Sequence, residues 1–98
     1  MRTTIASTEF YGVTPGGDRK RLTIAVGKPV RRGGGDGWQC KVAIADVLQP
    51  TAVGGSDSFD ALARAVGRVR LHLAGLQQEG WEFTLDGAGR EALDVATW

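Results

Sequence analysis

A capped, amphipathic helix between Asp57 and Leu76 is the feature that most limits what this chain can fold into. Its six large apolar side chains recur at alternating spacings of three and four residues, which places them on one stripe of a helix: Phe59, Leu62, Val66, Val69, Leu73 and Leu76. Asp57 or Ser58 can cap the first turn, and Gly80 is the natural residue to end the helix. One helix cannot bury this stripe alone, so the rest of the chain must supply a covering surface.

The rest of the chain has the alternation that is typical of short strands. Residues 20–27 and 38–45 each alternate, and their apolar members should share one face of a sheet: Leu22, Ile24, Val26, Trp38, Cys40, Val42 and Ile44. Residues 3–13 should pair with residues 20–27 across a Pro-Gly-Gly turn. Residues 46–55 indicate an edge strand, because Pro50 cannot donate to a central ladder, and residues 81–85 indicate a further strand.

These elements predict one small α+β domain over residues 1–98. We expect an antiparallel sheet of four to five strands, arranged as a meander, with the long amphipathic helix packed across one face. The other face of such a sheet can lie in water, which suits the polar residues that alternate with the core positions: Arg21, Thr23, Gln39 and Lys41. Residues 87–98 fit a strand, a helix or a disordered tail.

The composition argues against several functions. The single cysteine, Cys40, cannot form an internal disulfide, and no apolar run approaches the length of a membrane span, so a cytoplasmic location is expected. The only histidine, His72, excludes a multi-histidine metal site. The glycine-rich residues 33–37 join two strands and lack a phosphate-loop signature. We therefore expect no catalytic, cofactor-binding or metal site, with Cys40 buried and His72 at the edge of the apolar stripe.

Three short motifs give the chain a resemblance to a known family. They are Gly27-Lys28-Pro29 after a strand, Trp38-Gln39-Cys40 in the next strand, and Asp57-Ser58-Phe59-Asp60-Ala61-Leu62 at the start of the helix. With these motifs the chain resembles a family of small bacterial domains of unknown function, over most of residues 5–85. The resemblance implies the same fold and no established activity.

Basic residues are concentrated before the helix. Residues 1–41 hold eight Lys or Arg against three acids, whereas residues 42–98 hold four against eight. Six of the basic residues lie on and around the second strand: Arg19, Lys20, Arg21, Lys28, Arg31 and Arg32. Such a cluster can bind anions or nucleic acid by neutralising phosphates, although few aromatic residues lie near it for stacking on bases. A solvated strand face is the simpler interpretation.

The side of the helix opposite its apolar stripe is the other candidate for function. Leu71 is expected there, with Arg64 and Arg68 beside it. Arginine is favoured at the energetic centres of protein interfaces. We therefore expect a non-catalytic domain that binds a partner protein or a second copy of itself. The contact would use either the outer helix face, with Arg64, Arg68 and Leu71, or the open face of the sheet. Anion or nucleic-acid binding is the alternative, and an enzyme is the third.

Overall fold

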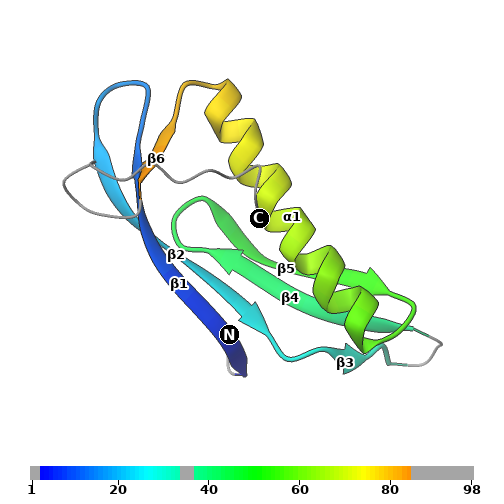
Figure 1. Cartoon of the computed structure of the whole chain (residues 1–98). Helices are drawn as coiled ribbons and strands as arrows, with labels where there is room; N and C mark the ends of the chain where they lie inside the picture. Colours follow the sequence, from blue (N-terminus) through cyan, green and yellow to red (C-terminus); the bar gives the residue numbers. More distant parts are fainter. Residues whose placement is uncertain (1–2, 34–36, 85–98) are drawn as a thin grey trace.

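The computed structural model, which describes residues 3–33 and 37–84, contains one antiparallel sheet with a helix across one face (Figure 1). The elements are β1 (Thr4–Val13), β2 (Arg19–Gly27), β3 (Val30–Arg31), β4 (Trp38–Ile44), β5 (Leu48–Gly55), α1 (Ser58–Gln78) and β6 (Glu82–Thr84). The predicted α+β fold is confirmed. The expectations for residues 87–98 lie outside the described residues.

The strand order goes beyond a simple meander. Strand β1 pairs with β2, β2 with β4, and β4 with β5. The two-residue β3 pairs with β4 on the same side as β2. Strand β6 pairs instead with β1, where Gly12 faces Phe83. Helix α1 therefore carries the chain across one face of the sheet, from the β5 edge to the β1 edge. Pro50 lies in β5, which is an edge strand as predicted.

The core lies between α1 and the sheet face that the strand alternation predicted. Its buried side chains come from the strands and the helix: Phe10, Leu22, Ile24, Val26, Cys40, Val42, Ile44, Ala61, Ala65, Val69, Leu73 and Phe83. Helix α1 packs chiefly on β4 and β5. The end of the sheet nearest the β1–β2 turn is covered by aromatic rings, because Trp81 stacks on Phe83 and the ring of Phe83 meets that of Phe10 edge to face.

The predicted stripe of α1 is wrong at two positions. Val69 and Leu73 are buried and Leu62 and Leu76 are half-buried, but Phe59 and Val66 are exposed. The line that meets the sheet is Ala61, Ala65, Val69 and Leu73, with a spacing of four residues. The cause is the close approach of the helix to β5: a Cβ added to Gly55 would lie 2.6 Å from the Cα of Ala61. Only small side chains fit at that approach, so the two alanines face the sheet.

Both ends of α1 are capped by short-range hydrogen bonds. The Asp57 side chain accepts from the Asp60 amide at 2.7 Å, which selects Asp57 over Ser58 as the cap. At the other end, the Gly80 amide donates to the carbonyl of Gln77 and the Trp81 amide to that of Leu76, while Gly80 has a φ of 106°. This is the pattern of a Schellman motif, and it confirms Gly80 as the stop.

Candidate functional site

The side of α1 that faces away from the sheet carries most of the exposed large apolar residues. The described part of the chain exposes five of them: Ile5, Val30, Phe59, Val66 and Leu71. Three belong to α1, with exposed fractions of 78% for Phe59, 41% for Val66 and 68% for Leu71. We call this side the outer face, which comprises Phe59, Ala63, Arg64, Val66, Gly67, Arg68, Arg70 and Leu71.

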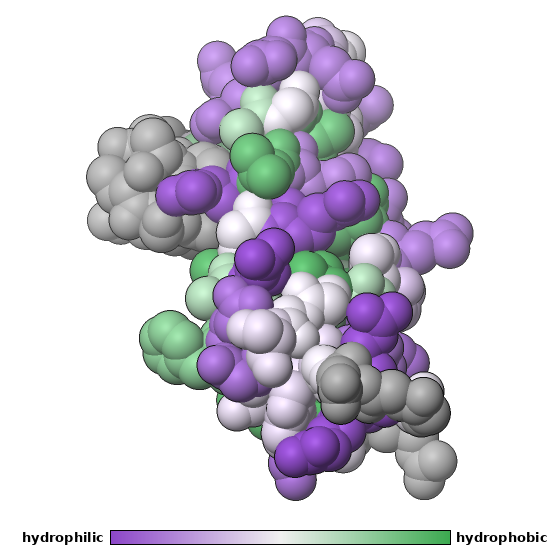
Figure 2. Space-filling model, turned by 90° about the vertical axis from the view of Figure 1, so that its right-hand side faces the viewer, coloured by the Kyte–Doolittle hydropathy of each residue, from purple (hydrophilic) through white to green (hydrophobic). Residues whose placement is uncertain are grey.

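The outer face has a small furrow between its larger side chains. With helix steps of about 100°, Ala63 and Gly67 point between Val66 on one flank and Leu71 on the other. A depression of about 140 Å³ lies there, lined by Ala63, Val66, Gly67 and Arg70. Figure 2, which views the molecule from the right-hand side of Figure 1, shows apolar groups separated by hydrophilic ones rather than merged into one patch. The outer face therefore has separate apolar side chains among polar ones, with a shallow furrow between them.

The charge on the outer face is almost entirely positive. Residues 58–78 contain three arginines, Arg64, Arg68 and Arg70, and one acid, Asp60. The Asp60 carboxylate accepts from the Ser56 amide at 2.8 Å and lies 3.1 Å from the Nε of Arg64. These contacts, the Ser56 amide first and Arg64 second, lower the pKa of Asp60 from its ordinary value. The one acid of the helix is thus already paired.

The structure divides the basic residues of the anion-binding alternative between the two ends of β2. Arg19, Lys20 and Arg21 begin that strand, whereas Lys28, Arg31 and Arg32 follow its other end. A strand rises about 3.3 Å per residue, so Lys20 and Lys28 are on the order of 26 Å apart. The six residues therefore do not form one continuous basic surface.

Several of these basic residues already have neighbours. An ion pair joins Arg21 to Glu9 with a nitrogen-to-oxygen distance of 3.9 Å, and both side chains are exposed. The guanidinium of Arg31 lies 5.3 Å from the ring centre of Trp38, which is within the range of a cation–π contact. Trp38 is therefore covered by an arginine and half-buried, and it does not present a free ring for base stacking.

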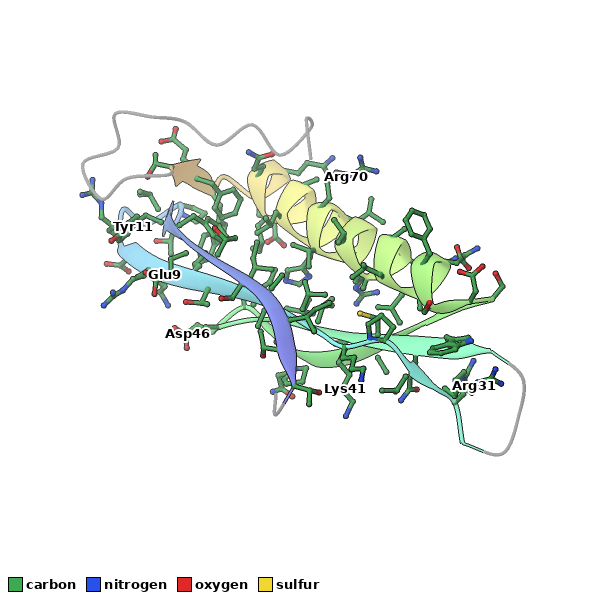
Figure 3. All side chains as sticks on the ribbon, turned by 60° about the horizontal axis from the view of Figure 1, so that its bottom comes forward. Glu9, Tyr11, Arg31, Lys41, Asp46 and Arg70 are labelled. Carbon is green, nitrogen blue, oxygen red and sulfur yellow. The ribbon has the colours of Figure 1, made fainter. Side chains whose placement is uncertain are left out.

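A second depression lies on the sheet face opposite α1. Lys41 alternates with the buried Cys40 and Val42, so it points away from the helix, as Figure 3 shows. Lys41 and Lys28 both line a half-open hollow of about 410 Å³. We call it the lysine hollow. The sequence placed Lys41 on the open face but did not place it beside Lys28, because that neighbourhood depends on how β2, β3 and β4 pair.

The two residues with catalytic potential are engaged in structural contacts. Cys40 is fully buried, as predicted, and its Sγ donates to the carbonyl of Gly27 at 3.1 Å. Burial raises the pKa of this thiol above its ordinary value of 9.0. The Nε2 atom of His72, a half-buried residue, lies 2.9 Å from the carbonyl oxygen of Val47 in the β4–β5 turn. Within residues 3–33 and 37–84, no group of three or more His, Cys, Asp or Glu side chains could hold a metal ion.

Arg64, Arg68 and Leu71 lie together on the outer face, as the sequence predicted, but Phe59 and Val66 were not expected there. Phe59 and Val66 are seven residues apart, and this spacing suits the core stripe as well as it suits the outer face. The alanines at 61 and 65 are the signal that could have separated the two interpretations, since a helix pressed closely on a sheet needs small residues.

The fold and its surfaces thus define a small domain in which one helix covers an antiparallel sheet, with mixed apolar and basic surfaces. The chain belongs to the family described as a domain of unknown function, DUF6968, whose model matches residues 11–93. The match extends further into the tail than the resemblance seen in the sequence. No curated protein and no solved structure matches the chain. In the described residues, no helix is both long enough and apolar enough to cross a membrane.

Proposed function

We propose that this domain is a non-catalytic protein-interaction module, and that it binds an acidic partner protein through the outer face of α1. The observation that carries the proposal is the exposure of Phe59, Val66 and Leu71 on one helix. Fully burying a large apolar side chain contributes about 1.5–3 kcal/mol. A partner that covered Phe59 and Leu71 would therefore gain roughly 3–6 kcal/mol before the costs of association.

The shape of the outer face suits an interdigitating partner. Ala63 and Gly67 form a furrow between the larger side chains, so a protruding side chain of the partner can enter it. Aromatic residues and arginines are enriched at the centres of interfaces, and Phe59 and Arg68 provide one of each. The separation of the apolar groups favours a modest, reversible contact over an obligate one.

The charge of the outer face favours an acidic partner over a second copy of the chain. A symmetric pair of copies would place two identical helices against each other, each with three arginines and one acid, and their net positive charges would repel. A partner that carries Asp or Glu would instead match the net positive charge of α1, whose three arginines outnumber its one acid, Asp60, which already pairs with Arg64. Homodimerisation through this face is accordingly the weaker form of the proposal.

The remaining features support a non-catalytic and cytoplasmic role. A buried thiol with a raised pKa is poorly suited to act as a nucleophile. A single cysteine that is buried as a core residue and forms no disulfide suits a reducing compartment. Nucleic-acid binding has less support, because its basic residues are divided between the two ends of β2.

The test compares charge substitutions on the outer face with a matched substitution elsewhere. Phe59→Glu and Leu71→Glu place an acid on the outer face, whereas Ile5→Glu alters an exposed apolar residue of β1. Proteins captured from the native host with the wild-type domain are identified, and the binding of each purified candidate is then measured directly. We expect an acidic partner whose affinity falls at least tenfold with either α1 variant, falls with added salt, and stays within twofold for Ile5→Glu.

Two results would contradict the proposal. One is a partner whose affinity is unchanged by both α1 variants while their thermal unfolding matches the wild type. The other is a loss of affinity as large in Ile5→Glu as in the α1 variants. Sedimentation velocity of the purified domain tests the choice of partner: a monomer is expected, and a dimer abolished by Leu71→Glu would replace the acidic partner with a second copy.

A further inference from the structure

The lysine hollow originates in a mismatch between neighbouring strands. Val26 of β2 faces Val42 of β4, and the next pair along the same side of β4 is Val30 of β3 with Gln39. Three residues, 27–29, therefore lie opposite only two residues of β4, 40 and 41. This is the arrangement of a β-bulge, which interrupts the ladder and bends the strand. On the α1 side the interruption is filled by Cys40, whose thiol bonds to Gly27, and on the other side it leaves the hollow.

The lining of the hollow combines positive charge with an apolar wall. Apart from Gly27, the described residues that line it are Thr3, Lys28, Val30, Gln39, Lys41 and Pro50. None of them is acidic, and in the part of the chain that the structure describes neither Lys28 nor Lys41 has an ion pair with a carboxylate. Lys28 and Lys41 line the same depression, and two positive charges at one site repel each other and attract a shared anion. The hydroxyl of Thr3 and the amide of Gln39 are available as neutral donors.

We propose that the lysine hollow binds a small organic anion, in which a carboxylate or phosphate group is attached to a short apolar chain. The anionic group lies between Lys28 and Lys41, and the apolar chain lies along Val30 and Pro50. The volume of about 410 Å³ is within the range of small-molecule sites, which begins at about 300 Å³. A bare inorganic ion would use only the charged part of this lining, whereas an amphipathic anion uses both parts. This site is on the opposite side of the sheet from α1, so the inference is independent of the proposed protein contact.

The experiment titrates ¹⁵N-labelled domain with a set of matched probes and follows its amide resonances. Octanoate and octyl phosphate have the chain and the charge, octanol has only the chain, and acetate and inorganic phosphate have only the charge. We expect saturable shifts at the amides of Gly27, Gln39 and Lys41 with an eight-carbon anion. Its affinity should be at least tenfold higher than that of octanol, acetate or inorganic phosphate. The tighter of the two eight-carbon anions identifies the preferred head group.

The chain provides its own control, since it has only three lysines. Lys28→Gln and Lys41→Gln should each weaken the binding of the preferred anion at least fivefold. Lys20→Gln, which removes the same charge at the other end of β2, should change it by less than twofold. Leu71→Glu should leave it unchanged, which separates the hollow from the apolar outer face of α1. The proposal is overturned by binding of octanol as tight as that of octanoate, by shifts confined to α1, or by equal losses in all three lysine variants.

Discussion

Gly55 is the last residue of β5, and the backbone of α1 occupies the space that a side chain there would need. A Cβ at this position would lie 2.6 Å from the Cα of Ala61 and 2.9 Å from the carbonyl carbon of Asp60. Carbon atoms pack at about 3.5–4.0 Å, so Gly55→Ala requires a displacement of about 1 Å. The obstructing atoms are backbone, and no change of rotamer can remove them. The helix itself must therefore move away from β5.

The expected cost is the balance of two effects. Overpacking of a tight contact costs about 1–3 kcal/mol, and here it also loosens Ala61 and Ala65 against the sheet. Replacing glycine by alanine offsets part of this by about 0.4–1 kcal/mol, because the unfolded chain loses conformational freedom. We expect Gly55→Ala to lower the free energy of unfolding by about 2 kcal/mol. For a domain of this size that corresponds to a fall in Tm of about 8–16 °C.

Gly54→Ala is the matched control for this substitution. It lies one residue earlier in the same strand, where an added Cβ would meet the end of the Arg32 side chain at 3.4 Å and the carbonyl oxygen of Trp38 at 3.9 Å. Both are tolerable contacts, so we expect a change within about 0.5 kcal/mol of wild type. Urea denaturation followed by circular dichroism measures both variants. Equal stabilities for Gly55→Ala and Gly54→Ala would refute the close approach of α1 to β5.

Three further predictions concern α1 and the core. Gly75→Ala should raise the stability by about 0.5–1 kcal/mol in urea denaturation, since it lies in the helix with nothing within 4 Å of the added Cβ, and a loss would mean that the helix end packs differently. Asp57→Ala should lower the free energy of unfolding by about 0.5–2 kcal/mol in the same assay, because it removes the helix cap. Asp57→Asn should retain most of the stability that the cap contributes. Because burial raises the pKa of Cys40 above 9.0, the thiol stays protonated to a higher pH in the folded state than in the unfolded state. Its contribution to stability is complete below about pH 9 and is lost as the pH rises through the folded-state pKa. Between pH 8 and pH 10, the urea midpoint should fall less for Cys40→Ala than for wild type. Equal falls in the two proteins would contradict the raised pKa of Cys40.

The local elements could be predicted because their causes lie within a few residues. The alternation in β2 and β4 reports directly which side chains share a face, since successive residues of a strand point to opposite sides. The capping at Asp57 and the stop at Gly80 depend on hydrogen bonds that span no more than five residues. The burial of Cys40 followed from the same alternation.

The candidate surfaces were predicted only in part. Leu71, Arg64 and Arg68 were correctly expected to be exposed together, because they lie on the opposite side of the helix from the stripe of large apolar residues. Phe59 and Val66 were wrongly assigned to the buried stripe. The stripe of large residues and the buried line of Ala61, Ala65, Val69 and Leu73 lie less than half a turn apart around the helix, so the spacing alone does not separate them. The meeting of Lys28 and Lys41 could not be expected, because it depends on the bulge between neighbouring strands.

By itself, the sequence determined that the chain forms several alternating strands, a helix with defined ends and one small core. Periodicity and capping are properties of short segments, so they can be recognised before the segments meet. Tertiary structure alone decided which face of α1 meets the sheet, that β6 pairs with β1, and that two lysines share a hollow. These outcomes depend on contacts between distant residues, above all the missing side chain of Gly55 against Ala61. The helix that the sequence shows most clearly is thus oriented by a residue that lies outside it.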